Sequence, residues 1–96
     1  MIEVRQTKEF STWLHGLRDA NAAARIVARI RRIEQGNPGD TRSVGQSVLE
    51  MRIDYGPGYR VYYLHRGPRI VVLLCGGDKR TQGQDIKRAQ TLAETL

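Results

Sequence analysis

The sequence predicts an α+β domain in which a helical hairpin packs on a small antiparallel sheet, with the elements in the order β-α-α-β-β-β-α. Three observations support this fold class. The chain opens with a short alternating stretch, continues with two segments of helical periodicity, and then shows three short strands separated by glycine–proline turns. Ninety-six residues can bury one core, so we expect a single domain over residues 1–96.

The first strand and the first helix are predicted from the opening residues. In IEVR, Ile2 and Val4 alternate with polar residues, which is typical of a strand. Thr7 can cap a helix that begins just after it. The apolar residues of that helix recur at spacings of three and four, at Phe10, Trp13, Leu14 and Leu17.

The second helix is expected over residues 20–35, capped by Asp19 or Asn21 and ended by Gly36. Its apolar stripe consists of Ile26, Ile30 and Ile33. Because the two helices are joined by so few residues, we expect an antiparallel hairpin whose stripes cover a common surface.

That surface is the predicted sheet. Residues 48–54 (VLEMRID) alternate strictly, with Leu49, Met51 and Ile53 on one side and Glu50, Arg52 and Asp54 on the other. The turns YGPG and RGPR separate this strand from residues 59–65 and then from residues 70–75, which predicts an antiparallel meander. The last strand is apolar on both faces and should lie near the middle of the sheet.

A closing helix is predicted after the last strand. Thr81 and Gln84 match a capping box, and Ile86, Ala89 and Ala93 mark the apolar side of the helix. Residues 37–47 form the one long loop that we expect. With both early helices on one face of the sheet, the other face should stay partly open.

The charge of the chain is its unusual property. The chain has sixteen Lys and Arg and ten Asp and Glu, which gives a net charge of +6, and thirteen of the sixteen basic residues are arginine. Arginine presents a planar, permanently charged fork that suits phosphate, so phosphate-bearing partners are favoured. A positive net charge can equally favour solubility or the binding of an acidic protein partner.

Several classes are excluded or disfavoured by the rest of the sequence. The single Cys75 cannot form an internal disulfide and fits a reducing compartment. The charged start does not resemble a signal peptide, and the longest apolar run, IVVLLC, is too short for a bilayer. We therefore expect a cytoplasmic protein without membrane contact.

The candidate site lies on the predicted hairpin. Strand alternation places Arg52 and Arg60 on the same side, with Tyr62 beside them, and Lys79 and Arg80 could close the rim. Guanidinium groups bind phosphates bidentately and tyrosine rings stack on unpaired bases, so the patch suits RNA. The alternative is a solvated sheet face with cross-strand pairing between Glu50 and an arginine.

The residue types restrict the chemistry that such a patch could perform. His15 and His65 are the only histidines and nothing near them has zinc spacing, so we expect no metal and no cofactor. No serine or cysteine has a recognisable nucleophile setting. What remains is metal-free RNA cleavage by a 2′-hydroxyl, which needs cations to stabilise charge and a group to move protons.

A stripe of arginines also follows the second helix at Arg25, Arg29 and Arg32, away from its isoleucines. It is either a solvated face or a docking surface for an acidic partner.

The stretches LEMRIDYGPGYRVYYL and IVVLLCGGDKRTQGQDIKRA resemble the RelE/ParE toxin superfamily, and within it the HigB-like branch known as addiction module killer or phage Gp49-like proteins. The resemblance implies a single RelE/ParE-like toxin domain that is neutralised by a co-encoded antitoxin. Many members cut messenger RNA on the ribosome without metal, whereas the ParE branch inhibits DNA gyrase.

The resemblance also implies roles for particular residues. Arg60 matches the arginine that contacts the scissile phosphate, Arg52 matches a basic position on the preceding strand, and Lys79 or Arg80 matches the basic residue after the last strand. Glu50 departs from the pattern, because some nucleases carry a basic residue there. The tyrosine that aids proton transfer has no counterpart, which leaves three substitutes open: Tyr62, Asp78 and His65.

Three functions therefore stay open. The first is a ribosome-dependent mRNA endoribonuclease, the second a non-enzymatic gyrase inhibitor, and the third a decayed toxin that only binds its antitoxin. The implied partners are the ribosome with its mRNA and a helix-turn-helix antitoxin of the HigA-like kind, through which any DNA contact would come.

Overall fold

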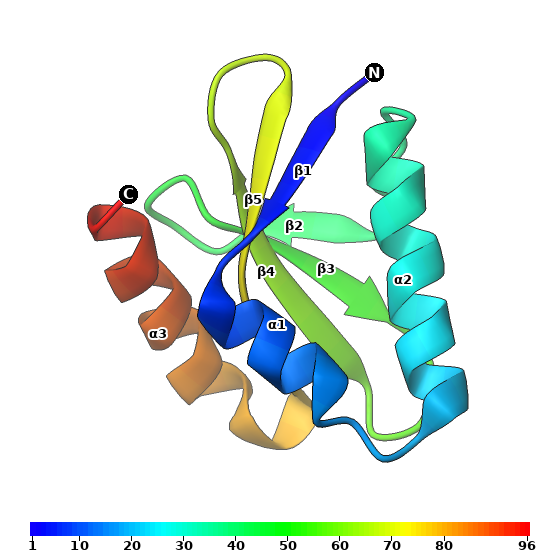
Figure 1. Cartoon of the computed structure of the whole chain (residues 1–96). Coiled ribbons are helices and arrows are strands. Elements are labelled where there is room, and N and C mark those ends of the chain that lie inside the picture. The colour runs from blue at the N-terminus through cyan, green and yellow to red at the C-terminus, as the bar shows by residue number, and fades with distance from the viewer.

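A computed structural model describes residues 1–96. The α+β class is confirmed, with three helices and a five-stranded sheet of order β1-β5-β4-β3-β2 (Figure 1). The elements are β1 (Glu3–Gln6), α1 (Lys8–His15), α2 (Ala20–Glu34), β2 (Thr41–Ser43), β3 (Leu49–Ile53), β4 (Tyr59–His65), β5 (Ile70–Asp78) and α3 (Gln82–Glu94). A short 3-10 turn, η1 (Lys79–Thr81), joins β5 to α3.

The sheet is mixed, and the prediction of a purely antiparallel sheet was wrong. β3, β4 and β5 form the expected antiparallel meander, but β1 pairs in parallel with β5, so that Glu3 lies opposite Ile70 and Gln6 opposite Leu73. The strand predicted to lie near the middle, β5, lies between β1 and β4. Both edges of β5 are therefore paired, and its two apolar faces are covered by α1 and α3.

One strand was not expected. β2 lies inside the predicted loop of residues 37–47 and pairs antiparallel with β3, so the order is β-α-α-β-β-β-β-α. Three residues are too few to show alternation in sequence. The pairing has a visible cause, because Arg42 lies opposite Glu50 and donates to its carboxylate.

The two early helices begin as predicted and cover one face of the sheet. The Thr7 hydroxyl accepts a hydrogen bond from the Phe10 amide at the start of α1, and the Asp19 carboxylate caps α2. The main core lies beneath them and consists of Phe10, Ile26, Ile30, Ile33, Met51, Ile53, Val61, Tyr63, Val71 and Leu73. None of the three helices has the length and apolar character needed to cross a membrane.

The helices do not form an antiparallel hairpin. Figure 1 shows α1 crossing in front of the lower end of the sheet while α2 rises along its right side. The apolar stripe of α2 reaches toward Met51 and Val61, whereas α1 is held against β5. Each helix is thus placed by its own part of the sheet rather than by the other helix.

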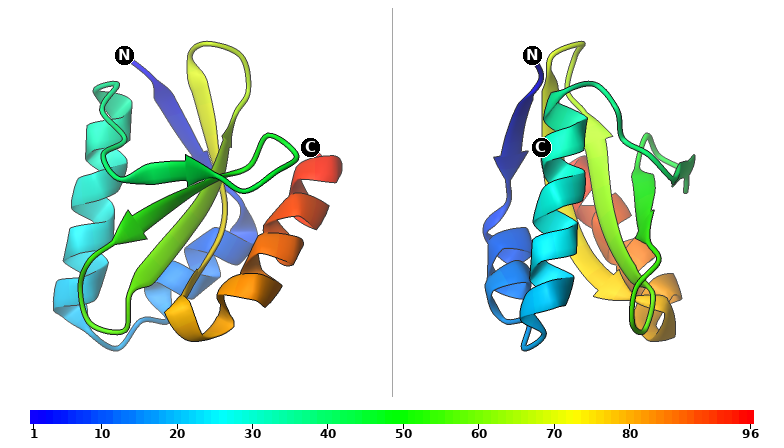
Figure 2. Two further views of the ribbon diagram at one scale, coloured as in Figure 1. Left: turned by 180° about the vertical axis from the view of Figure 1, so that it is seen from behind. Right: turned by 90° about the vertical axis from the view of Figure 1, so that its right-hand side faces the viewer.

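The second face of the sheet is covered by α3, so the expectation of a partly open face was wrong over β4 and β5 (Figure 2). A second core forms there from Val48, Tyr62, Leu64, Val72, Leu74, Cys75 and Ala89. The predicted capping box does not form, because the Thr81 hydroxyl donates to the Asp85 carboxylate and Asp78 caps η1 instead. Only the outer part of this face, near β3, remains exposed.

A pair of glycines lets α1 and α3 approach β5 from opposite sides. A Cβ atom at Gly76 would overlap the ring of Trp13 on α1, and a Cβ atom at Gly77 would overlap the carboxylate of Asp85 on α3. A β-bulge precedes them, since Tyr62 pairs with Cys75 but Tyr63 pairs with Leu73. Because successive residues of a strand face opposite sides, the two glycines serve the two helices in turn.

Candidate anion-binding pocket

A hollow of about 420 Å³ opens beside the turn between β3 and β4. We call it the arginine pocket. Its lining comes from the segment before β2, from the β3–β4 hairpin and from η1, and consists of Asp40, Arg52, Ile53, Asp54, Gly56, Pro57, Gly58, Arg60 and Lys79. Three of the four predicted cationic residues, Arg52, Arg60 and Lys79, are therefore brought together by segments distant in sequence.

Arg52 and Arg60 lie directly opposite each other on β3 and β4. Both point away from the core beneath α1 and α2, as alternation predicted. Arg52 is exposed and forms an ion pair with Asp40, with 2.9 Å between Nη2 and Oδ1. The hydrogen bond from Arg52 lowers the pKa of the Asp40 carboxyl below its ordinary value.

Arg60 is held more firmly. Only 12% of its side chain is exposed, and its Nη1 donates to the carbonyl of Gly58 at 3.2 Å. Its Nε is buried without a hydrogen-bond partner and lies 3.9 Å from Oε2 of Glu50. The guanidinium is therefore fixed in place while part of its donor capacity remains unused.

Glu50, next to Arg60, is the one charged residue buried completely. It accepts hydrogen bonds from Arg42 Nε at 2.8 Å, Gln82 Nε2 at 2.9 Å and the Tyr62 hydroxyl at 3.0 Å. Burial alone would raise the pKa of this carboxyl, but the three hydrogen bonds outweigh it and hold the pKa below its ordinary value. A buried, ionised carboxylate thus connects β2, β3, β4 and α3.

Tyr62 does not reach the pocket. The ring is completely buried under α3, and its hydroxyl donates to Glu50. Burial, together with the hydrogen bond to that carboxylate, raises the pKa of Tyr62 far above its ordinary value. The structure therefore makes Tyr62 a support for Glu50 and removes it from the groups that could exchange a proton with a ligand in the pocket.

The two basic residues of η1 differ in position. Lys79 lines the arginine pocket, whereas the side chain of Arg80 is 82% exposed and pairs with Asp78 at 3.0 Å. The Asp78 carboxylate also accepts from the Arg80 amide. Hydrogen bonding from Arg80 lowers the pKa of the Asp78 carboxyl. The ion pair between Asp78 and Arg80 thus lies outside the pocket, and each residue compensates the charge of the other.

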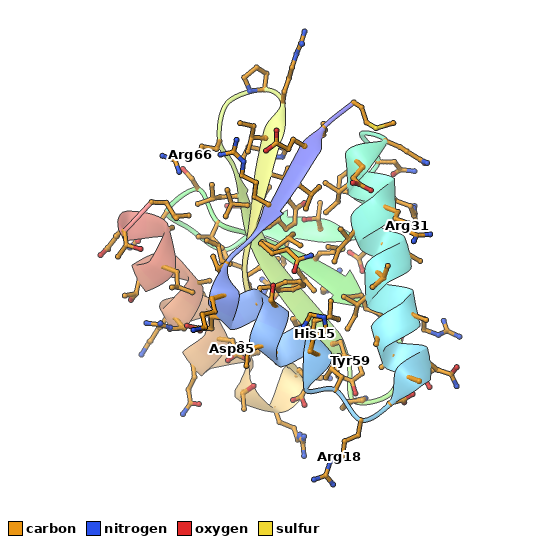
Figure 3. The ribbon with its side chains drawn as sticks, in the orientation of Figure 1. His15, Arg18, Arg31, Tyr59, Arg66 and Asp85 are labelled. Carbon is orange, nitrogen blue, oxygen red and sulfur yellow. The ribbon has the colours of Figure 1, made fainter.

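His65 lies at the far end of β4. It is five positions after Arg60, a distance of about 16 Å along a strand. It is exposed and its ring lies edge-on to Tyr63, with 6.1 Å between the centroids. Neither His65 nor the neighbouring Arg66, which lies in the upper part of the view in Figure 3 while Asp85 lies in the lower part, lines the pocket.

Two carboxylates line the pocket that the sequence did not identify as site residues, Asp40 and Asp54. Asp40 lies in the predicted loop of residues 37–47, and no pattern in the sequence marked it as a site residue. Asp54 could have been found, because alternation already placed it on the same side as Arg52. Asp40 is paired with Arg52, whereas Asp54 forms no ion pair.

The three arginines of α2 have different environments. Arg25 lies over the ring of Tyr55, with its Cζ 4.5 Å from the centroid. Arg29 donates to the backbone carbonyls of Arg52 at 2.6 Å, Pro38 at 3.0 Å and Asp40 at 3.3 Å. Burial lowers the pKa of the Arg29 guanidinium. Arg32 is exposed, so Arg29 is structural while Arg25 and Arg32 remain accessible.

The His, Cys, Asp and Glu side chains nowhere form a group of three or more that could hold a metal ion. The cationic groups available to an anion in the pocket are the two guanidinium groups and the ammonium group of Lys79.

Comparison with known proteins gives two matches. The model of a family described as phage derived protein Gp49-like (DUF891) matches residues 12–95. A protein of Haemophilus influenzae that carries the name "Uncharacterized protein" is 48% identical over 95 residues, which span 99% of this chain and 96% of that protein. No solved structure matches the chain at a significant level.

Proposed function

The chain belongs to the Gp49-like family of phage-derived proteins, within the RelE/ParE-like toxin superfamily, and on this basis we propose that it is the toxin of a type II toxin–antitoxin system. Its activity in this proposal is that of a ribosome-dependent endoribonuclease that cuts messenger RNA. The observation that carries the proposal is the convergence of Arg52, Arg60 and Lys79 on one pocket.

The reaction in this proposal begins with attack of a ribose 2′-oxygen on the adjacent phosphorus. The 2′-hydroxyl loses its proton, the bond from phosphorus to the 5′-oxygen breaks, and the products are a 2′,3′-cyclic phosphate and a 5′-hydroxyl. Negative charge builds up on the phosphoryl oxygens in the transition state. Fixed cations next to those oxygens stabilise it without further reorganisation.

Arg60 is suited to this role because it lines the pocket and its guanidinium is already held by the backbone through Nη1. Arg52 supplies a second fork once the phosphate competes with Asp40 for it. Lys79 adds a point charge from the other side of the pocket.

The proton of the 2′-hydroxyl needs an acceptor, and we assign this role to Asp54. Among the candidates named from sequence, Tyr62 is buried, Asp78 is bonded to Arg80, and His65 lies at the other end of β4. Asp54 lines the pocket and forms no ion pair, so its carboxylate is free to accept a proton. The departing 5′-oxygen then takes its proton from solvent.

The antitoxin in this proposal is a helix-turn-helix protein of the HigA-like kind. It neutralises the toxin by covering the arginine pocket or by keeping it away from the ribosome. DNA binding by the pair would then come through the antitoxin.

The test is primer extension on a reporter mRNA in a reconstituted translation system. We expect cuts that require ribosomes and that disappear in the variant Arg60→Ala. Arg66→Ala removes an exposed arginine at the far hairpin and should cut like the wild type. Circular dichroism establishes that both variants fold. Intact transcripts with the wild-type protein would overturn the proposal, and accompanying inhibition of gyrase would favour the ParE-type alternative.

A further inference from the structure

Two further hollows along α2 adjoin the arginine pocket through shared lining residues. A hollow of about 260 Å³ shares Ile53 and Asp54 with the pocket. Its remaining lining comes from one face of α2, at Arg25, Ala28, Arg29 and Arg32. A third hollow of about 480 Å³ shares Arg25 and Ala28 with the second and adds Asn21, Ala24 and Tyr55. We call the second and third hollows together the α2 groove.

We infer that the α2 groove binds the single-stranded RNA that flanks the phosphate held in the arginine pocket. The inference rests on the proposed function, since it extends the path of the same RNA strand beyond the cleavage site. Arg25 and Arg32 contact the flanking phosphates, and the stacked pair of Arg25 and Tyr55 receives a base.

The charges along the groove suit a phosphate backbone. Arg25 and Arg32 form no ion pair with any carboxylate of the chain, so their guanidinium groups are available. Arg32 is seven positions after Arg25, which is about 10 Å along a helix, so the two side chains can contact successive parts of one RNA strand. Asp54, at the junction of pocket and groove, is the one acidic residue in the groove lining.

The groove also offers a flat surface for a base. The Arg25 guanidinium lies over the Tyr55 ring, and the Tyr55 hydroxyl donates to Asp19 at 3.0 Å, which fixes the ring. Arg25 is exposed, so a ligand can reach its side chain from solvent. Unpaired bases stack on such planes without sequence preference. The exposed Ala24 and Ala28 leave the approach unobstructed.

An acidic protein segment could also bind two arginines, but the continuity with the pocket favours RNA. A strand whose phosphate lies between Arg52 and Arg60 must leave the pocket on some side, and on one side Ile53 and Asp54 line both the pocket and the neighbouring groove. An acidic peptide has no corresponding reason to follow the pocket edge.

Fluorescence anisotropy with uncleavable RNA tests the inference. The probes are a trinucleotide and a nonanucleotide, each with 2′-deoxyribose at every position before a scissile phosphate, so that binding is measured whether or not the protein cleaves. We expect the wild type to bind the longer RNA about tenfold more tightly or better, because charged hydrogen bonds to two flanking phosphates are added. The double variant Arg25→Ala/Arg32→Ala should lose this advantage and bind the trinucleotide like the wild type.

The matched control is Arg18→Ala/Arg31→Ala, which removes the same charge. Figure 3 shows Arg31 on the outer side of α2 and Arg18 at the turn before it, both directed away from the sheet. This control should keep the length advantage. For Arg25→Ala/Arg32→Ala, the slope of the logarithm of the nonanucleotide binding constant against the logarithm of the salt concentration should be smaller in magnitude by about 1.4. Each of the two lost phosphate contacts accounts for about 0.7 of this difference.

Three results would overturn the inference. In the first, Arg25→Ala/Arg32→Ala still binds the nonanucleotide more tightly than the trinucleotide, as the wild type does. In the second, both double variants weaken nonanucleotide binding equally. In the third, a glutamate-rich peptide that binds the wild type no longer binds Arg25→Ala/Arg32→Ala, although this variant still binds RNA like the wild type. The last result would make the groove a docking site for an acidic partner. Loss of mRNA cleavage in the translation assay with an intact length advantage would instead count against the nuclease proposal alone.

Discussion

Arg52 and Arg60 are cross-strand neighbours, so that two positive charges face each other on adjacent strands. Such a pair is destabilising by itself. Asp40 compensates Arg52 on one side and the buried Glu50 lies beside Arg60 on the other. The charge that a ligand would use is therefore balanced in the free protein by two carboxylates with different accessibility.

Substitution of Asp40 should strengthen anion binding. In Asp40→Asn the ion pair with Arg52 is lost, so a phosphate no longer competes with a carboxylate for that guanidinium. We expect RNA affinity to rise by roughly three- to tenfold at low salt, as for a local charge change next to a binding site. Glu94→Gln makes the same change in net charge on exposed α3 and controls for it. An equal rise in both variants would point to net charge rather than to the pocket.

Loss of the Glu50 carboxylate should destabilise the fold. Glu50→Ala leaves the donors of Arg42, Gln82 and Tyr62 without their acceptor, and breaking such a buried cluster costs about 3 kcal/mol of unfolding free energy. Tyr62→Phe removes one hydroxyl and should cost only about 1 kcal/mol. Urea denaturation measures both. A Glu50 variant as stable as the wild type would show that the cluster contributes no net stability.

Acid should destabilise the protein partly through Glu50. Its pKa in the folded state lies below the ordinary 4.5, so the folded state binds the proton less tightly than the unfolded state. The resulting stability is fully present above pH 4.5 and is lost as the pH falls through the lower folded pKa. One such group contributes a slope of at most about 1.4 kcal/mol per pH unit. Denaturation of Glu50→Gln from pH 7 to 3 should show a shallower slope than the wild type.

Alanine at either glycine of β5 should destabilise the protein for different reasons. Gly76→Ala pushes against the Trp13 ring, which cannot move without disturbing α1, and overpacking of this kind costs about 3 kcal/mol. Gly77→Ala meets the end of the Asp85 side chain, so the double variant Gly77→Ala/Asp85→Ala should recover much of the loss. Thermal unfolding of the four proteins measures this, and absence of recovery would place the strain in the backbone instead.

Cys75 should be unreactive in the folded protein. It is buried beside α3, and burial raises the pKa of its thiol to about 12. The thiolate is the reactive form, so alkylation of the native protein at pH 8 should be roughly a hundredfold slower or more than in urea. Mass spectrometry of iodoacetamide-treated protein measures the rate. Fast labelling without denaturant would show that α3 opens readily.

Local patterns in the sequence predicted the elements but not all of their neighbours. The periodic isoleucines of α2 and the alternation of β3 are properties of a single segment, so they were visible in sequence. The parallel pairing of β1 with β5 and the addition of β2 depend on contacts between distant segments. No periodicity encodes such a contact.

In the candidate site, too, the sequence predicted the local pattern but not the contacts between distant segments. Alternation placed Arg52, Arg60 and Tyr62 on one side of the hairpin, and they do share it. It could not show that α3 covers that side over Tyr62 and leaves Arg52 exposed, because coverage depends on where a later helix packs. Asp40 enters the pocket from a segment without any pattern, which only the folded chain reveals.

The parallel pairing of β1 with β5 joins the first and the last strand of the sheet in chain order. The Thr7 hydroxyl donates to the carbonyl of Leu74, 67 residues later in the chain. Until β5 exists, α1 lacks the strand against which it packs, and contacts of such long sequence separation form slowly. Lys79 completes the pocket and Gln82 completes the cluster around Glu50 only after that strand. The growing polypeptide therefore lacks its anion-binding surface until β5, η1 and the start of α3 have been synthesised.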